Sequence, residues 1–284
     1  MPMKNPLSDL LYLWPRRTLF VGRLSQPIEF CQAAASLVVG IEGPVQLALP
    51  DTQSVWHEHA LMIAPGKNVR IDTGGQLVAA CYLDALGRDF RLLSQRMARH
   101  EAGVYSGLED EQHLKHWLSS LYSAPTTATD TYDRLESLIN PGAWAYPTTE
   151  PRVARVVELI QSEVATNVSV EELASAVNLS VSRLVELFRA EVGVPVRRYR
   201  QWHRLFVTFT GIERGASLTE SAIAAGFADS SHFSHTFRMT LGMKSSDIVA
   251  MLSGRIYVGG SDPMAAIPDS QAGAVTSAPA DNPG

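Results

Sequence analysis

The sequence predicts an α+β protein, with short strands near its N-terminus and helices over most of the remainder. Three observations predict this. Short apolar runs broken by Gly and Pro occupy residues 1–90, apolar side chains recur three and four residues apart further on, and two similar helical units follow one another near the C-terminus. A chain of 284 residues that is 45% hydrophobic and 19% charged is long and apolar enough for two folded domains.

The N-terminal strands are short and evenly separated by turn signals. Gly43-Pro44, Pro65-Gly66 and Gly74-Gly75 provide these breaks. Short strands at this spacing are typical of a small barrel or sandwich. The expected strands cover residues 18–24, 36–41, 45–49, 61–64, 68–71 and 76–83.

Two flanking helices are expected after the strands, over residues 88–100 and 109–123. The second begins with an acidic turn, which suits a helix N-terminus. Its apolar stripe consists of Leu114, Trp117, Leu118 and Leu121. Such a stripe packs either on the protein's own barrel or on the same helix of a second copy. The sequence leaves both readings open, and the second predicts a homodimer through helix 109–123.

Two segments have the composition of connections rather than of packed elements. Residues 140–151 are rich in Pro and small residues, although Trp144 and Tyr146 suggest that this linker packs against a domain. The final stretch is rich in Ala, Gly, Ser and Pro and is expected to be disordered. The predicted organisation is an N-terminal domain over 1–139, a linker over 140–151, a helical domain over 152–255 and a disordered tail over 256–284.

Two units near the C-terminus share one pattern. Each has a short helix, an Asn or Gly suited to a positive φ, a small polar residue at a helix start, and apolar residues four apart. The turn residues are Asn178 and Gly226, and the apolar pairs are Leu184/Phe188 and Phe233/Phe237. Each unit therefore reads as a helix-turn-helix, and two in one chain indicate a protein that places two recognition helices on DNA.

These two units resemble the DNA-binding domain of the AraC/XylS family of bacterial transcription regulators. The match covers roughly residues 152–250. The more specific half is Gly-Phe-Ala-Asp-x-Ser-His-Phe-Ser-x-x-Phe-Arg, which begins at Gly226, and the looser half is Leu-Ala-x-x-x-Asn-x-Ser-x-x-x-Leu-x-x-x-Phe, which begins at Leu173. The resemblance implies a cupin-like sensor domain over residues 1–139 that dimerises through its flanking helices.

The first unit opens with a capping-box pattern, Ser169-Val170-Glu171-Glu172. Ser180 is expected to cap the second helix, with Leu184 and Phe188 inward. By resemblance, Ser182, Val185 and Glu186 occupy base-facing positions. Glu186 either accepts a hydrogen bond from a cytosine amino group or is a solvated carboxylate that disfavours nearby phosphate. The residues expected to contact DNA from this unit are Ser180, Ser182, Arg183, Val185, Glu186 and Arg189.

In the second unit, Phe233, Phe237 and Leu241 are expected to face inward. Ser230 and Ser231 lie at the helix start, where free N–H groups favour phosphate. His235 is the expected base-edge reader and Arg238 the expected phosphate contact. The residues expected to contact DNA from this unit are Ser230, Ser231, Ser234, His235 and Arg238.

The helix between the units carries four arginines that either face solvent or contact the DNA backbone: Arg197, Arg198, Arg200 and Arg204. The chain also departs from the family pattern. Residues 205–209 are more apolar than usual and are expected to pack against the N-terminal domain or a partner. Ser221 stands where the family usually has an aliphatic core residue, so Ser221→Ile is expected to stabilise the domain.

Charge and cysteine usage narrow the function classes further. The net charge is −5, and residues 150–255 hold 12 Lys/Arg against 11 Asp/Glu, so strong nonspecific DNA binding is not expected. Cys31 and Cys81 lie in apolar contexts typical of reduced thiols in a cytoplasmic protein. No apolar run is long enough for a membrane span.

No arrangement of residues indicates catalysis, and no cofactor is expected. His57 and His59 could share one face of a strand, but no matching later His completes a metal set within residues 60–99. The leading interpretation is a DNA-binding transcription regulator, activator or repressor, that responds to an effector of unknown identity, with RNA polymerase as a candidate partner. The alternatives are a regulator controlled by a protein partner and a cupin-type metalloenzyme fused to a DNA-binding domain.

Overall fold

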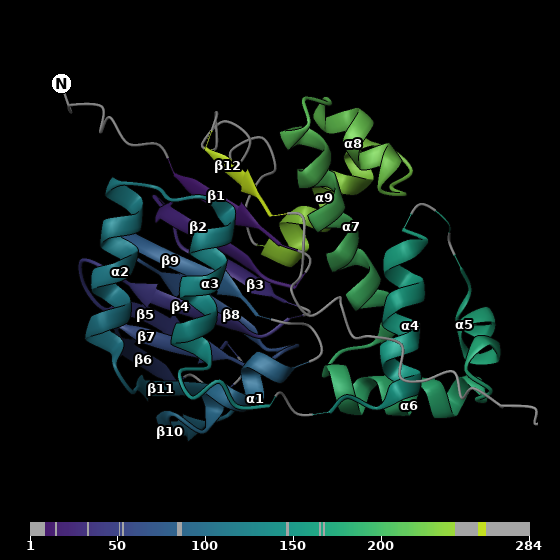
Figure 1. Ribbon diagram of the computed structural model, residues 1–284, viewed down its shortest axis with the longest axis horizontal. Helices are drawn as coiled ribbons and strands as arrows, with labels where there is room; N and C mark the ends of the chain where they lie inside the picture. Colours follow the sequence, from purple (N-terminus) through teal and green to yellow (C-terminus); the bar gives the residue numbers. More distant parts are fainter. Residues whose placement is uncertain are drawn as a thin grey trace, which may run out of the picture.

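The computed structural model describes residues 9–241 and 255–259, apart from positions 15, 33, 51, 53, 84–86, 146–147, 165 and 167. Figure 1 shows a strand-rich part beside a group of helices. The strands are β1 Leu10–Leu13, β2 Thr18–Arg23, β3 Ile28–Cys31, β4 Ser36–Gly40, β5 Val45–Ala48, β6 Val55–Glu58, β7 Ala60–Ile63, β8 Asn68–Asp72, β9 Leu77–Tyr82, β10 Met97–Glu101, β11 Val104–Leu108 and β12 Ile256–Val258. The helices are α1 Arg88–Ser94, α2 Glu111–Ser123, α3 Ala128–Ile139, α4 Pro151–Ser162, α5 Val170–Ala176, α6 Val181–Val192, α7 Val196–Glu213, α8 Leu218–Ala224 and α9 Ser230–Leu241.

The strands form two sheets. The larger has the order β10-β11-β7-β4-β9-β2-β1-β12, and the smaller has the order β3-β8-β5-β6. Alternation along the strands explains the layering: in β5, Val45 and Leu47 are buried while Gln46 is exposed. The buried faces of both sheets contribute to one apolar cluster that includes Leu47, Leu61 and Ile71. The α+β prediction and all six expected strands are confirmed, each within two residues at its ends.

Helices α2 and α3 cover the other face of the large sheet (Figure 1). The stripe on α2 is turned toward that sheet, where Leu118 and Leu121 are each 2% exposed. They pack in a cluster with Leu10, Tyr12 and Leu37 of the strands. The stripe therefore packs on the protein's own sheet. The observation that favoured dimerisation through it no longer does so, because these side chains are not available to a second copy.

The helix expected over residues 88–100 is shorter than predicted. It ends at Ser94, and the chain then forms the antiparallel hairpin of β10 and β11. Ala102 and Gly103 take φ values of 51° and 87° in the turn of that hairpin. The prediction failed because β10 is exposed along nearly its whole length and shows no apolar alternation.

The disordered tail was also predicted to begin too early. Residues Ile256–Val258 form β12, which pairs in parallel with β1 at the edge of the large sheet. The remainder of the predicted tail, from residue 260, lies outside the described residues. The chain thus returns from the helical part to the strand-rich part after α9.

The segment between α3 and α4 holds one further difference. The Trp144 side chain is 53% exposed and does not pack against a domain. Instead, the Asn140 side chain accepts from the Trp144 N–H and donates to its carbonyl oxygen, both at 2.9 Å. Tyr146, the other aromatic residue of the predicted linker, lies outside the described residues.

Candidate DNA interface

The first helix-turn-helix unit consists of α5, a turn at Asn178, and α6. The Ser169 hydroxyl accepts from the Glu172 N–H at 3.1 Å, and the Glu172 carboxylate accepts from the Ser169 N–H at 2.6 Å, which forms the predicted capping box. Asn178 takes a φ of 55°, as the turn requires. Ser180 then caps α6 by accepting from the Arg183 N–H at 3.3 Å.

One face of α6 is fully buried and the other faces solvent. Leu184 and Phe188 are both 0% exposed and pack in one cluster with Val153 and Val156 of α4. Burial at positions four apart fixes the rotation of the helix about its axis. The structure places the six predicted residues of this unit together at the surface, on α6 and its N-cap: Ser180, Ser182, Arg183, Val185, Glu186 and Arg189.

Two of these surface residues form an ion pair. Arg183 Nη1 lies 2.8 Å from Glu186 Oε2, with the side chains 53% and 70% exposed. An exposed pair three residues apart contributes only a few tenths of a kcal/mol to stability, about 0.2–0.5. Its consequence is positional, because the pair holds both side chains over the same turn of α6.

The second unit repeats the arrangement with α8, a turn at Gly226, and α9. Gly226 has a φ of 85°. A Cβ at this position would come within 2.9 Å of the Val164 carbonyl oxygen, so both the φ and the close contact favour glycine here. Ser217 and Glu220 form a second capping box, which the pattern Ser-x-x-Glu in the sequence could have revealed.

The apolar side of α9 is buried as predicted. Phe233 and Phe237 are 0% exposed, and Phe237 packs against Phe209 of α7 with ring centroids 5.7 Å apart. On the other side, Ser231, His235 and Arg238 are exposed, and Ser230 and Ser234 are half-buried. Leu241 is the third residue that was expected to face inward, and its side chain lies outside the described part of the structure.

The residue that caps α9 is one that the sequence analysis missed. Asp229 Oδ1 accepts from the His232 N–H at 2.7 Å, and the Asp229 carbonyl oxygen accepts from the Phe233 N–H at 3.1 Å. A phosphate near Ser230 and Ser231 would therefore meet a carboxylate already placed at the helix N-terminus. The signal was present, because Asp directly before a helix is a preferred N-cap.

Helix α7 joins the two units, and its arginines do not form a single solvated face. Arg197 is exposed, but the Arg198 guanidinium donates to Cys31 Sγ of β3 at 3.0 Å, and Arg204 is 9% exposed. The apolar part of α7 packs on the strand-rich part of the chain, where Leu205 and Phe209 join the cluster of the sheets. This confirms one of the two expectations for residues 205–209, contact with the N-terminal domain.

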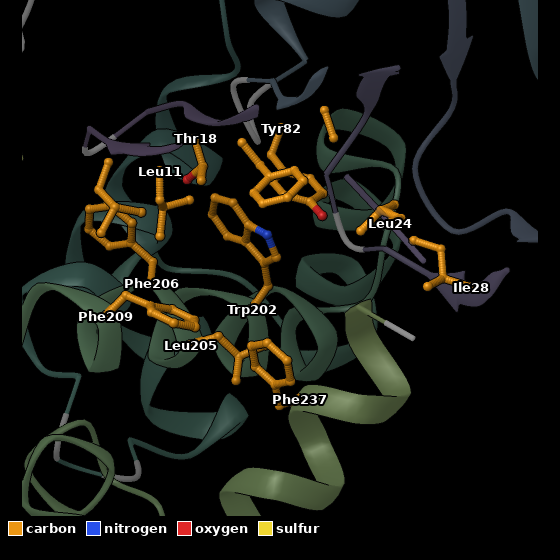
Figure 2. Close-up of a pocket in the computed structure, with 13 residues that line it drawn as sticks. Leu11, Thr18, Leu24, Ile28, Tyr82, Trp202, Leu205, Phe206, Phe209 and Phe237 are labelled. Atoms are coloured by element: carbon orange, nitrogen blue, oxygen red, sulfur yellow. The ribbon is translucent and has the colours of Figure 1, made fainter. Parts of the chain in front are cut away.

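A cavity of about 80 Å³ lies between α7 and the large sheet. Figure 2 shows the Trp202 indole extending from α7 toward Thr18 and Tyr82, with the rings of Phe206 and Phe209 beside it. No charged side chain is among its lining residues. These are Leu11, Leu13, Thr18, Phe20, Leu24, Ile28, Ala80, Tyr82, Trp202, Leu205, Phe206, Phe209 and Phe237.

The two histidines considered as metal ligands have different surroundings. His57 is exposed on β6, whereas His59 lies after the strand and has Nδ1 3.2 Å from the Gly40 carbonyl oxygen and 3.1 Å from Lys115 Nζ. Within the described ranges, no three metal-binding side chains gather. None of the helices described is both long and apolar enough to cross a membrane.

Comparison with known proteins agrees with this architecture. A family model described as a helix-turn-helix domain matches residues 173–250. The structure is similar to that of ToxT from Vibrio cholerae O395, with a TM-score of 0.57 and 13% identity over 84% of this chain and 99% of that chain. It is also similar to ToxT from Vibrio cholerae strain SCE256 with a bound unsaturated fatty acid, with a TM-score of 0.56 and 13% identity over 84% and 97% of the two chains. No curated protein sequence matches the chain.

At 13% identity the likeness to ToxT establishes the fold, a strand-rich N-terminal domain followed by a helical domain. The class is therefore a two-domain protein with paired helix-turn-helix units for DNA binding. The helix-turn-helix family model covers residues 173–250, which is most of the stretch that resembles the DNA-binding domain of the AraC/XylS family, and the structure has two helix-turn-helix units in that stretch.

Proposed function

We propose that this protein is a sequence-specific transcription regulator that reads DNA with α6 and α9 and responds to an effector through its N-terminal domain. One observation carries the proposal. Each unit buries an aromatic and apolar face and leaves polar and basic side chains exposed on its second helix. One continuous helix, α7, connects the units, so both reading helices belong to one framework. Two such helices suit successive major-groove segments roughly 34 Å apart.

The proposed contacts divide between reading and anchoring. On α6, Glu186 accepts from a cytosine amino group and Val185, 41% exposed, touches a thymine methyl group. On α9, His235 reads a base edge and Arg238 contacts phosphate. The remaining proposed contacts to the backbone and groove come from Ser180, Ser182, Arg183, Arg189, Ser230, Ser231 and Ser234.

The proposed effector is an uncharged, largely apolar molecule that binds in the cavity between α7 and the large sheet. Supporting this, the lining is aliphatic and aromatic and comes from both domains. A ToxT structure carries an unsaturated fatty acid. Here a cavity of about 80 Å³ accepts only a small molecule unless side chains such as Trp202 and Phe206 move. An effector shifts the protein only if it binds one arrangement of the domains better than another.

We further propose that the protein is not an enzyme, acts in the cytoplasm, where its DNA is, and forms a homodimer through helix 109–123. That contact must use the polar outer face of α2, since the apolar stripe is buried. A dimer would place four recognition helices on DNA and raise the apparent affinity through effective concentration. RNA polymerase remains a candidate partner of the DNA-bound form.

Footprinting on DNA beside the protein's own gene tests the central proposal. We expect two protected segments about one helical turn apart for each protomer. Replacing Arg183 and Glu186 together by Ala should remove protection from one segment and leave the other. A single short footprint that this double substitution leaves unchanged would show that only one unit reads DNA.

The effector site is tested by adding small apolar compounds and following tryptophan fluorescence and the melting temperature. A compound that binds beside Trp202 should quench its emission and raise the melting temperature. Leu205→Gln should abolish both effects while the protein stays folded. Val55→Gln, at an exposed position on β6, is the control.

A further inference from the structure

A second cavity lies between the outer strands of the two sheets, β6 of the smaller sheet and β10 of the large sheet. Figure 1 shows β6, β10 and β11 at the edge of the strand-rich part that is away from α7 and α9. The cavity has a volume of about 450 Å³. Ligand pockets typically have roughly 300–1,000 Å³. It shares no lining residue with the cavity beside α7, and it is lined by Trp56, Arg99, His100, Glu101, Val104 and Ser106.

Two side chains of β6 face the interior of the sandwich at this cavity. In the antiparallel pairing with β5, Trp56 lies beside Leu47, and Glu58 lies two residues further along, beside Val45. Leu47 and Val45 are buried in the apolar cluster between the sheets. Residues directly opposite each other in a sheet share a face. Trp56 therefore points inward, where it packs in part on that cluster and in part lines the cavity.

Two charged side chains of β10 face the same interior. Arg99 lies opposite Ser106 of the neighbouring strand β11, and Glu101 lies opposite Val104. Ser106 and Val104 are both buried, and Val104 belongs to the apolar cluster between the sheets. Arg99 and Glu101 therefore extend from the inner face of the hairpin, where they line the cavity and remain exposed to solvent.

The charges around the cavity do not cancel. Arg99 Nη2 lies 2.7 Å from Glu58 Oε1, so this guanidinium is already paired with a carboxylate. Glu101 forms no ion pair within the described part of the chain. Lys67 packs along Gly103 in the turn of the hairpin and is not among the lining residues. The excess charge is therefore negative, which disfavours a carboxylate or phosphate as ligand.

Charged side chains on an outer strand also prevent it from pairing with a second sheet. That role accounts for Arg99 and Glu101, but it requires neither an aromatic ring nor a hydroxyl group beside them. An ammonium group is attracted to the face of an indole ring and to a carboxylate. The combination of Trp56, Glu101 and Ser106 therefore suits a ligand that carries a positive charge.

We propose that this cavity binds an organic cation, an amine or a quaternary ammonium compound. Trp56 contacts the cationic group with its ring, Glu101 supplies the opposite charge, and Ser106 hydrogen-bonds to a polar group of the ligand. Arg99, held by Glu58, forms the wall of the cavity. The site is separate from the apolar cavity beside α7, and it does not depend on DNA binding.

Calorimetry on the full-length chain with three compounds tests the site. These are choline, putrescine and the uncharged carbon isostere of choline. We expect at least one of the two cations to bind at millimolar concentration, and its affinity to fall as salt is added, because Glu101 is exposed. The isostere should bind at least about twofold more weakly than choline if choline binds. Absence of binding by both cations, or equal binding of choline and its isostere, would overturn the proposal.

Variants place the bound cation in this cavity. Trp56→Leu removes the ring, and Glu101→Lys reverses the charge on an exposed side chain that folding does not require. Each should weaken cation binding by roughly 2- to 30-fold. Trp144→Leu and Glu171→Lys change exposed residues of the same types elsewhere and should bind as the wild type does. Unchanged binding by Glu101→Lys, or an equal loss in Glu171→Lys, shows that the cation binds elsewhere, even where circular dichroism finds Trp56→Leu unfolded.

Discussion

Ser221 of α8 occupies the space that a side chain at position 211 of α7, which is a glycine, would need. A Cβ at Gly211 would come within 2.6 Å of Ser221 Oγ and 2.9 Å of Ser221 Cβ. Ser221 is 3% exposed, and its hydroxyl has no hydrogen-bond partner among the described residues. Two small residues thus allow α7 and α8 to pack closely. The expectation that Ile would fit at position 221 came only from the aliphatic residue usual in the AraC/XylS family. The close contact between Ser221 and Gly211 argues against it.

Ser221→Ile should therefore lower the melting temperature instead of raising it. Forcing extra methylene groups into this contact costs about 1–3 kcal/mol. Ser221→Ala should be neutral or stabilising, because it removes a buried hydroxyl without a partner. Ile223→Ser, at a 53% exposed position on the same helix, is the control and should have little effect. A higher melting temperature for Ser221→Ile would mean that α8 moves away from α7 at no cost.

Local signals predicted the helix-turn-helix units well because those units are built from local interactions. The Ser169 cap and the positive φ of Asn178 depend on residues within one or two turns, and the four-residue apolar spacing that turns Phe188 inward lies within α6. The strands of the two sheets were also predicted from a local signal, the alternation of buried and exposed side chains. For the candidate DNA interface, the sequence predicted which side chains of the second helices face outward.

Elements that depend on distant partners could not be predicted. The strand β12 is only three residues long, lies in an Ala/Gly/Ser/Pro-rich stretch, and forms because the edge of β1 and the Tyr12 ring are available to it. Arg198 was grouped with a charged surface, yet it is bonded to Cys31 across the domain contact. Neither contact leaves a periodic pattern, since each joins residues far apart in the chain.

His235 and Arg238 should have different effects on DNA recognition, although both are exposed on α9. His235→Ala should reduce the preference at one or two base pairs by about 1–3 kcal/mol. Arg238→Ala should weaken binding to all sequences alike and reduce the salt dependence by about one ion. Binding measured on a set of single-base operator variants at several salt concentrations separates these effects. A specificity change in Arg238→Ala with none in His235→Ala would reverse the assignment.

Glu186→Gln should change sequence preference and not overall affinity. Arg183 occupies Oε2 of Glu186, and a carboxylate has further lone pairs to accept from a cytosine amino group. We expect discrimination at one base pair to fall by about 1–3 kcal/mol. Glu171→Gln, an exposed carboxylate on α5, is the matched control. Uniformly tighter binding to every operator variant would show that Glu186 is a solvated carboxylate near phosphate.

His203 should make the stability of the helical domain depend on pH. Burial lowers its pKa from 6.5 to about 4 in the folded protein. Between these values the unfolded chain binds the proton and the folded chain does not, so stability is full above pH 6.5 and falls as the pH drops toward 4. The loss by pH 5 is up to about 2 kcal/mol. Urea unfolding at pH 7 and pH 5 should show it, and His203→Gln should reduce the difference between the two.

The two faces of α2 should respond differently to charge. Leu118→Glu places a carboxylate where the wild-type side chain is 2% exposed in the protein's own core, so it should unfold the N-terminal domain. Circular dichroism and thermal melting will detect this.

Ser119→Arg with Ser123→Arg alters only the exposed outer face of α2, where the two residues lie one helical turn apart. If the homodimer forms through helix 109–123, this double variant should stay folded and show half the wild-type mass by light scattering. A folded double variant with the mass of a wild-type dimer would place the dimer contact elsewhere, and a monomeric wild type would remove the dimer altogether.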